Sequence, residues 1–160
     1  MSRRDCESCT ACCEGWLSSK NVGMSFGNPC QHCTDKGCAI YTTRPKNPCR
    51  TFECEWIRSS GNTPEMPEAM RPDRCGAIVL ADREFHGWKV LIATPTGWKI
   101  PQKTLEQLMQ YARDRQTPLI WIENFQRDGA YSHFSRSGFG PKPFMDTIAR
   151  HSNDLDSLEI

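Results

Sequence analysis

The chain has 160 residues, a formal net charge of +1 and a hydrophobic share of 38%. A single domain is expected at this length, and the near-neutral charge gives no reason to expect nucleic acid, a membrane surface or a strongly charged substrate as partner. The longest apolar runs, such as residues 119–122, are far shorter than the roughly 20 residues that a membrane span needs, so the sequence predicts a soluble protein.

The dominant feature of the sequence is its cysteine content, because nine of the ten cysteines lie between residues 6 and 54. They are Cys6, Cys9, Cys12, Cys13, Cys30, Cys33, Cys38, Cys49 and Cys54. Where two residues separate a pair of cysteines, a tight backbone turn can aim both sulfurs at one ion, and thiolates select zinc, Cu(I) or iron–sulfur clusters. We therefore predict that these nine cysteines are metal ligands.

The adjacent pair Cys12 and Cys13 indicates more than one site. Neighbouring side chains diverge by about 100° on a helix and point to opposite faces of a strand, so one ion rarely takes both. Eight or nine sulfurs are about what two four-coordinate ions require. The sequence predicts two metal sites, with zinc as the favoured metal and iron or an iron–sulfur cluster as the alternative.

The cysteines could instead form disulfides or an iron–sulfur site. A disulfide framework is typical of exported domains, but no apolar signal-peptide core precedes Cys6, and a cytoplasmic location is expected. The spacing of Cys6, Cys9 and Cys12 is that of bacterial ferredoxins, although Cys13 follows where three residues would be expected. A remote cysteine such as Cys30 could then complete an iron–sulfur site.

The first half of the chain is poor in core-forming residues. From the Leu, Ile, Val and Phe set, residues 1–75 contain only Leu17, Val22, Phe26, Ile40, Phe52 and Ile57. Burial alone does not order such a segment, whereas structural zinc supplies on the order of 10–16 kcal/mol of apparent binding free energy. We predict a metal-organised lobe over residues 1–57 with little regular structure beyond a short helix at 5–14, and a linker or long loop over 58–75.

Residues 76–160 are predicted to form a small α+β lobe. Apolar and β-branched runs predict strands over residues 76–85, 88–94, 119–123 and 130–134, with His86-Gly87 as a tight turn. Apolar residues at helical spacing predict one helix over 101–115. The expected fold is α+β, with a small antiparallel sheet and one covering helix beside the cysteine-rich lobe, in one compact domain overall.

The remaining cysteine, a histidine in the cysteine-rich segment and the last part of the chain are predicted to lie outside the main metal-ligand set. Cys75 is predicted to be a small core residue, and His32 is kept as an alternative metal ligand. The glycine-rich residues 135–142 lack the spacing of a phosphate-binding loop, and no strong helix pattern follows them. The acidic residues 153–160 are expected to be frayed or loosely docked.

The segment from Cys38 to Pro45, the run Cys49-Arg50-x-Phe52 and the opening cysteines together resemble the CxxCxxCC cysteine-cluster family (YkgJ-like). The resemblance covers residues 6–57. This chain has three residues between Pro45 and Cys49 where two are commoner, and it adds Cys33 and Cys54. The resemblance implies zinc or iron chelation. A related cluster occurs in longer proteins described as flagellin lysine N-methylases, so whether the chain is an enzyme stays open.

The charge and ligand chemistry suggest what such a centre would do. A zinc with four thiolates carries a formal charge of −2, which Arg44 and Arg50 could offset. All-sulfur sites usually leave no open position for water, and no general base is recognisable nearby. We therefore expect a structural or carried metal and a protein partner, with an iron-dependent metalloenzyme or redox protein as the alternative.

Overall fold

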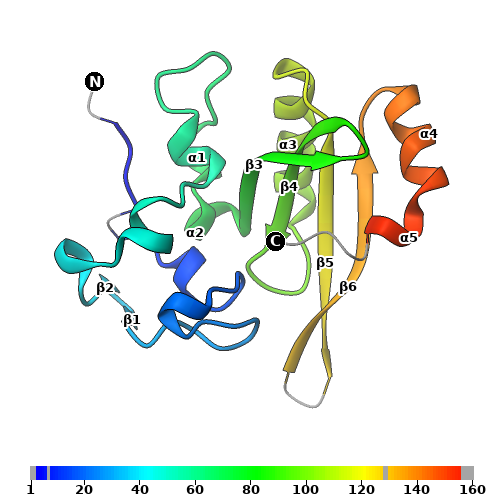
Figure 1. Cartoon of the computed structure of the whole chain (residues 1–160). Helices are drawn as coiled ribbons and strands as arrows, with labels where there is room; N and C mark the ends of the chain where they lie inside the picture. The colour runs from blue at the N-terminus through cyan, green and yellow to red at the C-terminus, as the bar shows by residue number, and fades with distance from the viewer. Residues whose placement is uncertain (1–2, 7, 128–129, 156–160) are drawn as a thin grey trace.

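The computed structural model describes residues 3–6, 8–127 and 130–155, with side chains described outside residues 125–135. A four-stranded sheet in the order β3-β4-β5-β6 lies at its centre (Figure 1). The strands are β3 (Ala77–Phe85), β4 (Trp88–Pro95), β5 (Leu119–Arg127) and β6 (Ala130–Phe139). The predicted α+β class is confirmed. The Asp128-Gly129 turn lies outside the described residues.

The first two strands form the predicted hairpin around His86-Gly87. Phe85 pairs with Trp88 in an antiparallel register, and both turn residues have positive φ, 46° at His86 and 81° at Gly87. Two-residue hairpin turns require this left-handed backbone because its twist matches that of the flanking strands. A local sequence signal therefore sets this register.

The centre of the sheet differs from the antiparallel arrangement that was predicted. β4 and β5 run parallel, with Leu91 opposite Leu119 and Ala93 opposite Trp121, whereas β5 and β6 are antiparallel. Helix α3 (Gln102–Asp114) connects β4 to β5, and such a crossover returns the chain in the same direction. The sheet is therefore mixed, with two antiparallel hairpins joined by one parallel pair.

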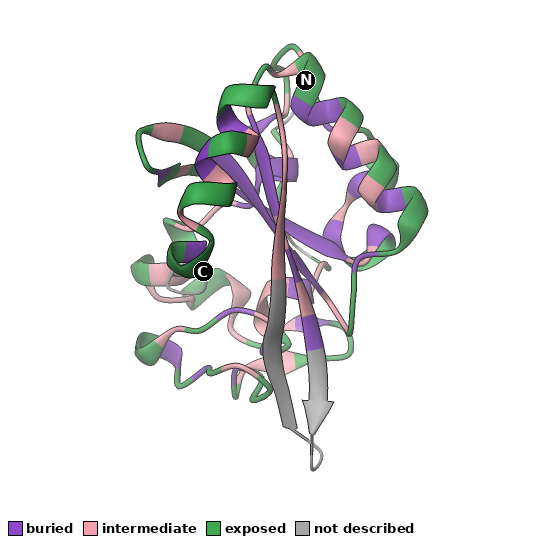
Figure 2. Ribbon diagram, turned by 90° about the vertical axis from the view of Figure 1, so that its right-hand side faces the viewer, coloured by how far each residue is buried: buried purple, intermediate pink, exposed green. Residues whose placement is uncertain are grey.

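Helices cover both faces of the sheet, where a single covering helix was predicted. Figure 2 shows the buried strands between α3 on one side and α4 (Lys142–Arg150) with α5 (Ser152–Leu155) on the other. Phe144 of α4 is fully buried and meets the Trp88 ring edge-on, with ring centroids 5.5 Å apart. The helix that follows the glycine-rich turn thus supplies part of the core, and only residues 156–160 of the tail lie outside the described residues.

The N-terminal half has little regular structure, as predicted. Its elements are β1 (Cys33–Thr34), β2 (Gly37–Cys38), α1 (Glu55–Arg58) and α2 (Pro72–Cys75), with single turns at Ala11–Cys13, Lys20–Val22, Tyr41–Thr43, Lys46–Arg50 and Glu68–Met70. The helix expected over 5–14 is reduced to the turn at Ala11–Cys13. In the described part of the chain no helix has the length and apolar character needed to cross a membrane.

Two short helices attach the cysteine-rich half to the sheet. α1 and α2 both contact β3, and the Thr104 hydroxyl of α3 donates to the Cys75 carbonyl at 2.7 Å. Glu55 of α1 is fully buried, and its Oε1 accepts hydrogen bonds from the Tyr111 hydroxyl at 2.6 Å and from Arg115. Buried carboxylates need such partners. The buried side chains form one continuous core from Ala11 to Leu155.

The unexpected helix α4 gives a test of the core. Replacing Phe144 by alanine is expected to lower the free energy of unfolding by about 3–5 kcal/mol, because it removes a fully buried aromatic ring and leaves a cavity. Lys142→Ala, on the exposed side of α4, is the matched control and should change it by less than about 0.5 kcal/mol. Urea unfolding measures both. Equal effects of the two substitutions would contradict this packing.

Candidate metal centre

Backbone hydrogen bonds shape the cysteine motifs into tight turns. The Cys9 amide donates to the Cys6 carbonyl at 2.6 Å, and the Cys33 amide donates to the Cys30 carbonyl at 2.9 Å. The Cys30 amide also donates to the Cys13 carbonyl at 2.9 Å, which brings the second motif against the first. The two-residue spacing therefore folds into the turns expected from the sequence.

A glycine permits a further close approach near these motifs. Gly15 has φ of 91°, and a Cβ at this position would lie 2.8 Å from the Asn28 carbonyl carbon. The Gly15 carbonyl accepts a hydrogen bond from the Gly27 amide at 2.8 Å. The loop before Cys30 can therefore fold onto the segment that follows Cys13 only because residue 15 has no side chain.

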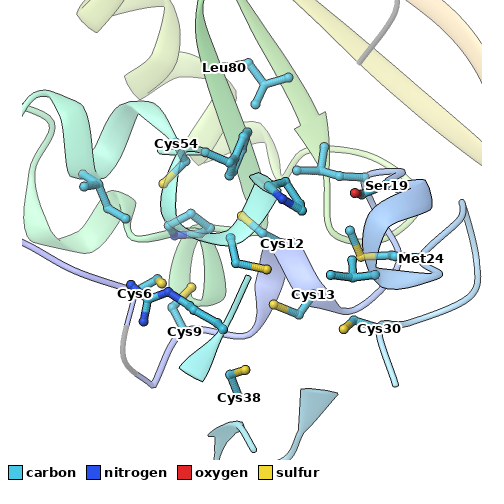
Figure 3. A pocket seen from close by; sticks show the side chains of 18 of the residues that line it. Cys6, Cys9, Cys12, Cys13, Ser19, Met24, Cys30, Cys38, Cys54 and Leu80 are labelled. Carbon is cyan, nitrogen blue, oxygen red and sulfur yellow. The ribbon is translucent and has the colours of Figure 1, made fainter. Parts of the chain in front are cut away.

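The sulfurs surround a shared cavity of about 250 Å³ beside the edge of the sheet (Figure 3). Eight of the nine predicted ligands line it, namely Cys6, Cys9, Cys12, Cys13, Cys30, Cys38, Cys49 and Cys54. Apolar side chains, including Leu17, Met24 and Leu80, form much of the remaining wall. Cys33 does not line the cavity but pairs with Cys38 across β1 and β2. All ten cysteines are free thiols.

The adjacent pair Cys12 and Cys13 faces two different groups of sulfur. Removal from water raises the pKa of the Cys12 thiol well above its ordinary value of 9.0, and repulsion from Cys54 and then Cys9 adds to this shift. For Cys13, removal from water again acts first in raising the pKa. The sulfurs that next raise it are those of Cys33, Cys30 and Cys38.

The repelling neighbours of the other cysteines mostly fall into the same two sets, although Cys12 is also repelled by Cys13, and Cys6 raises the pKa of both. The pKa of Cys54 is raised to about 11, mainly by burial, with Cys9 and Cys6 as its repelling neighbours. The pKa of Cys49 is raised by burial and then by Cys30 and Cys38. We name the first set, Cys6, Cys9, Cys12 and Cys54, group 1. We name the second set, Cys13, Cys30, Cys33, Cys38 and Cys49, group 2.

Two hydrogen-bond donors in the cavity wall have no partner among the described residues. Arg44 stacks on the Tyr41 ring, with its guanidinium carbon 3.8 Å from the ring centroid, and its Nη1 donates to the Tyr41 carbonyl at 3.0 Å. Its Nε is buried without a hydrogen bond, and so is Nε1 of Trp56. Both residues line the cavity, so both unpaired donors belong to side chains that enclose the sulfurs.

The charge of Arg44 acts on both groups. It lowers the pKa of Cys6 in group 1 and of Cys49 in group 2, against the larger upward effect of burial at each. Arg50 is exposed and donates through Nε to the Arg44 carbonyl at 2.8 Å. The structure therefore brings Arg44 to the sulfurs, whereas the contact of Arg50 is to the backbone of Arg44. Trp56, interpreted from sequence as a packing residue, supplies a hydrogen-bond donor that no sequence pattern indicated.

The sulfurs encircle a space instead of converging on a point. Among the described residues, the only group of His, Cys, Asp or Glu side chains with three ligand atoms all within 4.8 Å of one another contains no cysteine. Four thiolates on one zinc lie about 3.8 Å apart, given a Zn–S bond of about 2.3 Å. As they stand, the side chains of either group would have to move inward to hold a single ion.

The remaining candidates lie away from the cavity. Cys75 is buried in the core, where its thiol lies 3.4 Å from both the Met70 and the Ala77 carbonyl oxygens and can donate its one hydrogen to either, which agrees with its predicted role. His32 does not line the cavity, and its Nε2 lies 3.4 Å from Nε2 of Gln31. The side chain of His133 lies outside the described ones.

The arrangement can bind a cation through thiolates in a largely apolar setting, with donors available to the resulting anionic centre. Comparison with known proteins found no matching family model, curated protein or solved structure. Function is therefore inferred from the chemistry of the site itself.

The raised thiol pKa values predict how the metal-free, reduced protein responds to pH. Folding keeps the Cys13 thiol protonated up to a pKa of about 12, from an ordinary value of 9.0. A pKa that is higher in the folded state contributes stability that is complete below pH 9 and is lost as the pH rises towards 12. The free energy of unfolding in urea should fall over this range, and less steeply in Cys13→Ser. If the free energy of unfolding had the same pH dependence in the wild-type protein and in Cys13→Ser, the raised pKa of Cys13 would be contradicted.

Proposed function

We propose that this chain is a cytoplasmic metal-binding protein in which the cysteine cluster holds zinc or iron at two sites. The observation that carries the proposal is the cavity lined by eight thiols and by the buried, unpaired guanidinium nitrogen of Arg44. Unpaired buried donors are costly. A metal–thiolate centre is anionic and accepts hydrogen bonds at sulfur, so it would satisfy the donors and neutralise the repulsion among the thiolates.

The division of the cysteines supports two sites. Group 1 contains four sulfurs, which is the number that one closed tetrahedral site requires. Group 2 contains five, so one of its sulfurs is surplus to a four-coordinate site. Because the adjacent Cys12 and Cys13 fall into different groups, the two centres would be neighbours separated by a single peptide unit.

A structural or carried metal is the role we propose for these sites, with another protein as partner. All-sulfur coordination leaves no position for activating water. The resemblance to the CxxCxxCC family points to the same zinc or iron chelation. The metal would supply cohesion in the half of the chain where aliphatic residues are scarce.

An iron–sulfur cluster is a second candidate, favoured by the wide spacing of the sulfurs. A cluster of several irons and bridging sulfides holds its cysteine ligands further apart than one zinc ion does. Its stability and potential also depend on hydrogen bonds to sulfur and on burial, and Arg44 Nε and Trp56 Nε1 are unused donors in the wall of the cavity.

Metal content tests the two-site proposal and separates its two forms. Protein purified without oxygen should contain about two zinc ions per chain and be colourless, or contain iron and sulfide and be brown. Cys12→Ser and Cys13→Ser should each lose about half of the metal, whereas Cys75→Ser should keep all of it. Circular dichroism monitors folding in every variant. Metal-free protein, or equal losses in Cys75→Ser and Cys12→Ser, would contradict the proposal.

Arg44 gives an independent test of the anionic centre. Arg44→Gln keeps a polar side chain but removes the positive charge, so the affinity for metal should fall by about 10–100-fold, the usual effect of losing a group that supports the ligands. Arg74→Gln removes an exposed charge that is paired with Glu68 and should leave the affinity unchanged. Competition with a chelator measures both. If Arg44→Gln bound metal as tightly as the unsubstituted protein, Arg44 would have no role at the metal centre.

A further inference from the structure

A second cluster of metal-ligating side chains lies outside the cysteine cavity. His86 Nε2 is 2.8 Å from Asp154 Oδ2, and His151 Nδ1 is 3.5 Å from the same oxygen. The two imidazole rings stack with centroids 3.7 Å apart and planes inclined by 17°. All three ligand atoms lie within 4.8 Å of one another, and none of the three residues lines the cysteine cavity.

The fold holds these side chains together from two distant segments. His86 occupies the hairpin turn between β3 and β4, where its positive φ sets the direction of its side chain. His151 follows the last residue of α4, and the Asp154 amide of α5 donates to the His151 carbonyl at 3.0 Å. Asp154 is therefore placed beside His151 by a turn of the backbone.

Contacts next to this cluster hold α4 against the start of β4, directly after the His86-Gly87 turn. The Trp88 indole donates to the Thr147 hydroxyl at 3.3 Å, and the same ring packs edge-on against Phe144. Trp88 follows the hairpin turn directly, whereas Thr147 lies one helical turn before His151. The convergence of the three ligands therefore rests on core packing, which is the support that a preorganised site needs.

The distances suit an ion bound by nitrogen and oxygen. Metal bonds of about 2.0–2.2 Å to imidazole and carboxylate place neighbouring ligand atoms roughly 3–3.5 Å apart, and the separations of the two histidine nitrogens from Asp154 Oδ2, 2.8 and 3.5 Å, lie close to this range. Imidazole suits zinc, nickel, copper and iron. A cation in contact with His86 Nε2, His151 Nδ1 and the Asp154 carboxylate would be attracted by a lone pair of each of the three groups.

We propose that His86, His151 and Asp154 form a site for a divalent transition-metal ion, with water in its remaining positions. His86 and Asp154 are exposed and His151 is partly exposed, so an ion can enter from solvent. The nitrogen and oxygen ligands make this site chemically distinct from the thiolates. It is also independent of the function proposed for the cysteines.

Nickel titration of the full chain, as purified, tests the proposal. Calorimetry should find one saturable Ni²⁺ per chain, weakened at least tenfold by His151→Ala and by Asp154→Asn, since loss of a ligand costs no less than loss of its supporting residue. Asp146→Asn, which alters an exposed carboxylate paired with Lys142 on α4, should not change it. Absence of saturable binding, or equal binding in all variants, would overturn the proposal.

Magnetic resonance of the unsubstituted protein provides a readout that does not depend on how the variants fold. Paramagnetic Ni²⁺ should broaden the ring-proton signals of His86 and His151 at substoichiometric amounts, while the signals of His32, beside Cys33, stay sharp. Broadening of His32 first would place the nickel at the cysteines and would overturn the assignment to the histidines.

Discussion

Removal of sulfur from water is the central physical constraint in the first half of this protein. Thiols gathered around one cavity can remain there as neutral groups, with raised pKa values, or as thiolates that a cation holds together. The first state contributes little cohesion, because the segment has few aliphatic side chains and much of its backbone lies in turns. The second state would draw on the unpaired donors of Arg44 and Trp56, which is why we interpret the cavity as a metal centre.

The sheet makes a rigid wall for that cavity. β3 and β4 are buried over most of their length, within a sheet that has α3 on one face and α4 with α5 on the other, and strands covered on both faces are continuously apolar. Leu80 of β3 reaches the cavity, while α1 and α2 contact the same strand. The irregular half is thus built against an edge whose position is set by ordinary hydrophobic packing.

Local signals predicted the parts of the structure that depend on local chemistry. The His86-Gly87 turn and the divergence of Cys12 from Cys13 follow from backbone geometry at adjacent residues. Helix α4 was missed because Pro141 and Pro143 obscure its start, and because the space for Phe144 depends on Gly140, where a Cβ would lie 2.7 Å from the ring. The parallel pairing of β4 with β5, the grouping of Cys54 with Cys12, and the approach of His86 to Asp154 are tertiary relations that no local pattern encodes.

The order Cys54-Glu55 carries a consequence for how this sequence can change over evolutionary time. Cys54 presents its sulfur to the cavity. Glu55 presents a buried carboxylate to Tyr111 of α3 and to Arg115, which directly follows α3. An insertion or deletion between them would rotate α1 and misplace one of the two groups, so the spacing here is fixed by two unrelated chemistries at once. The exposed loop around residues 61–63 contributes neither a cavity sulfur nor a buried carboxylate. Insertions and deletions can therefore accumulate there.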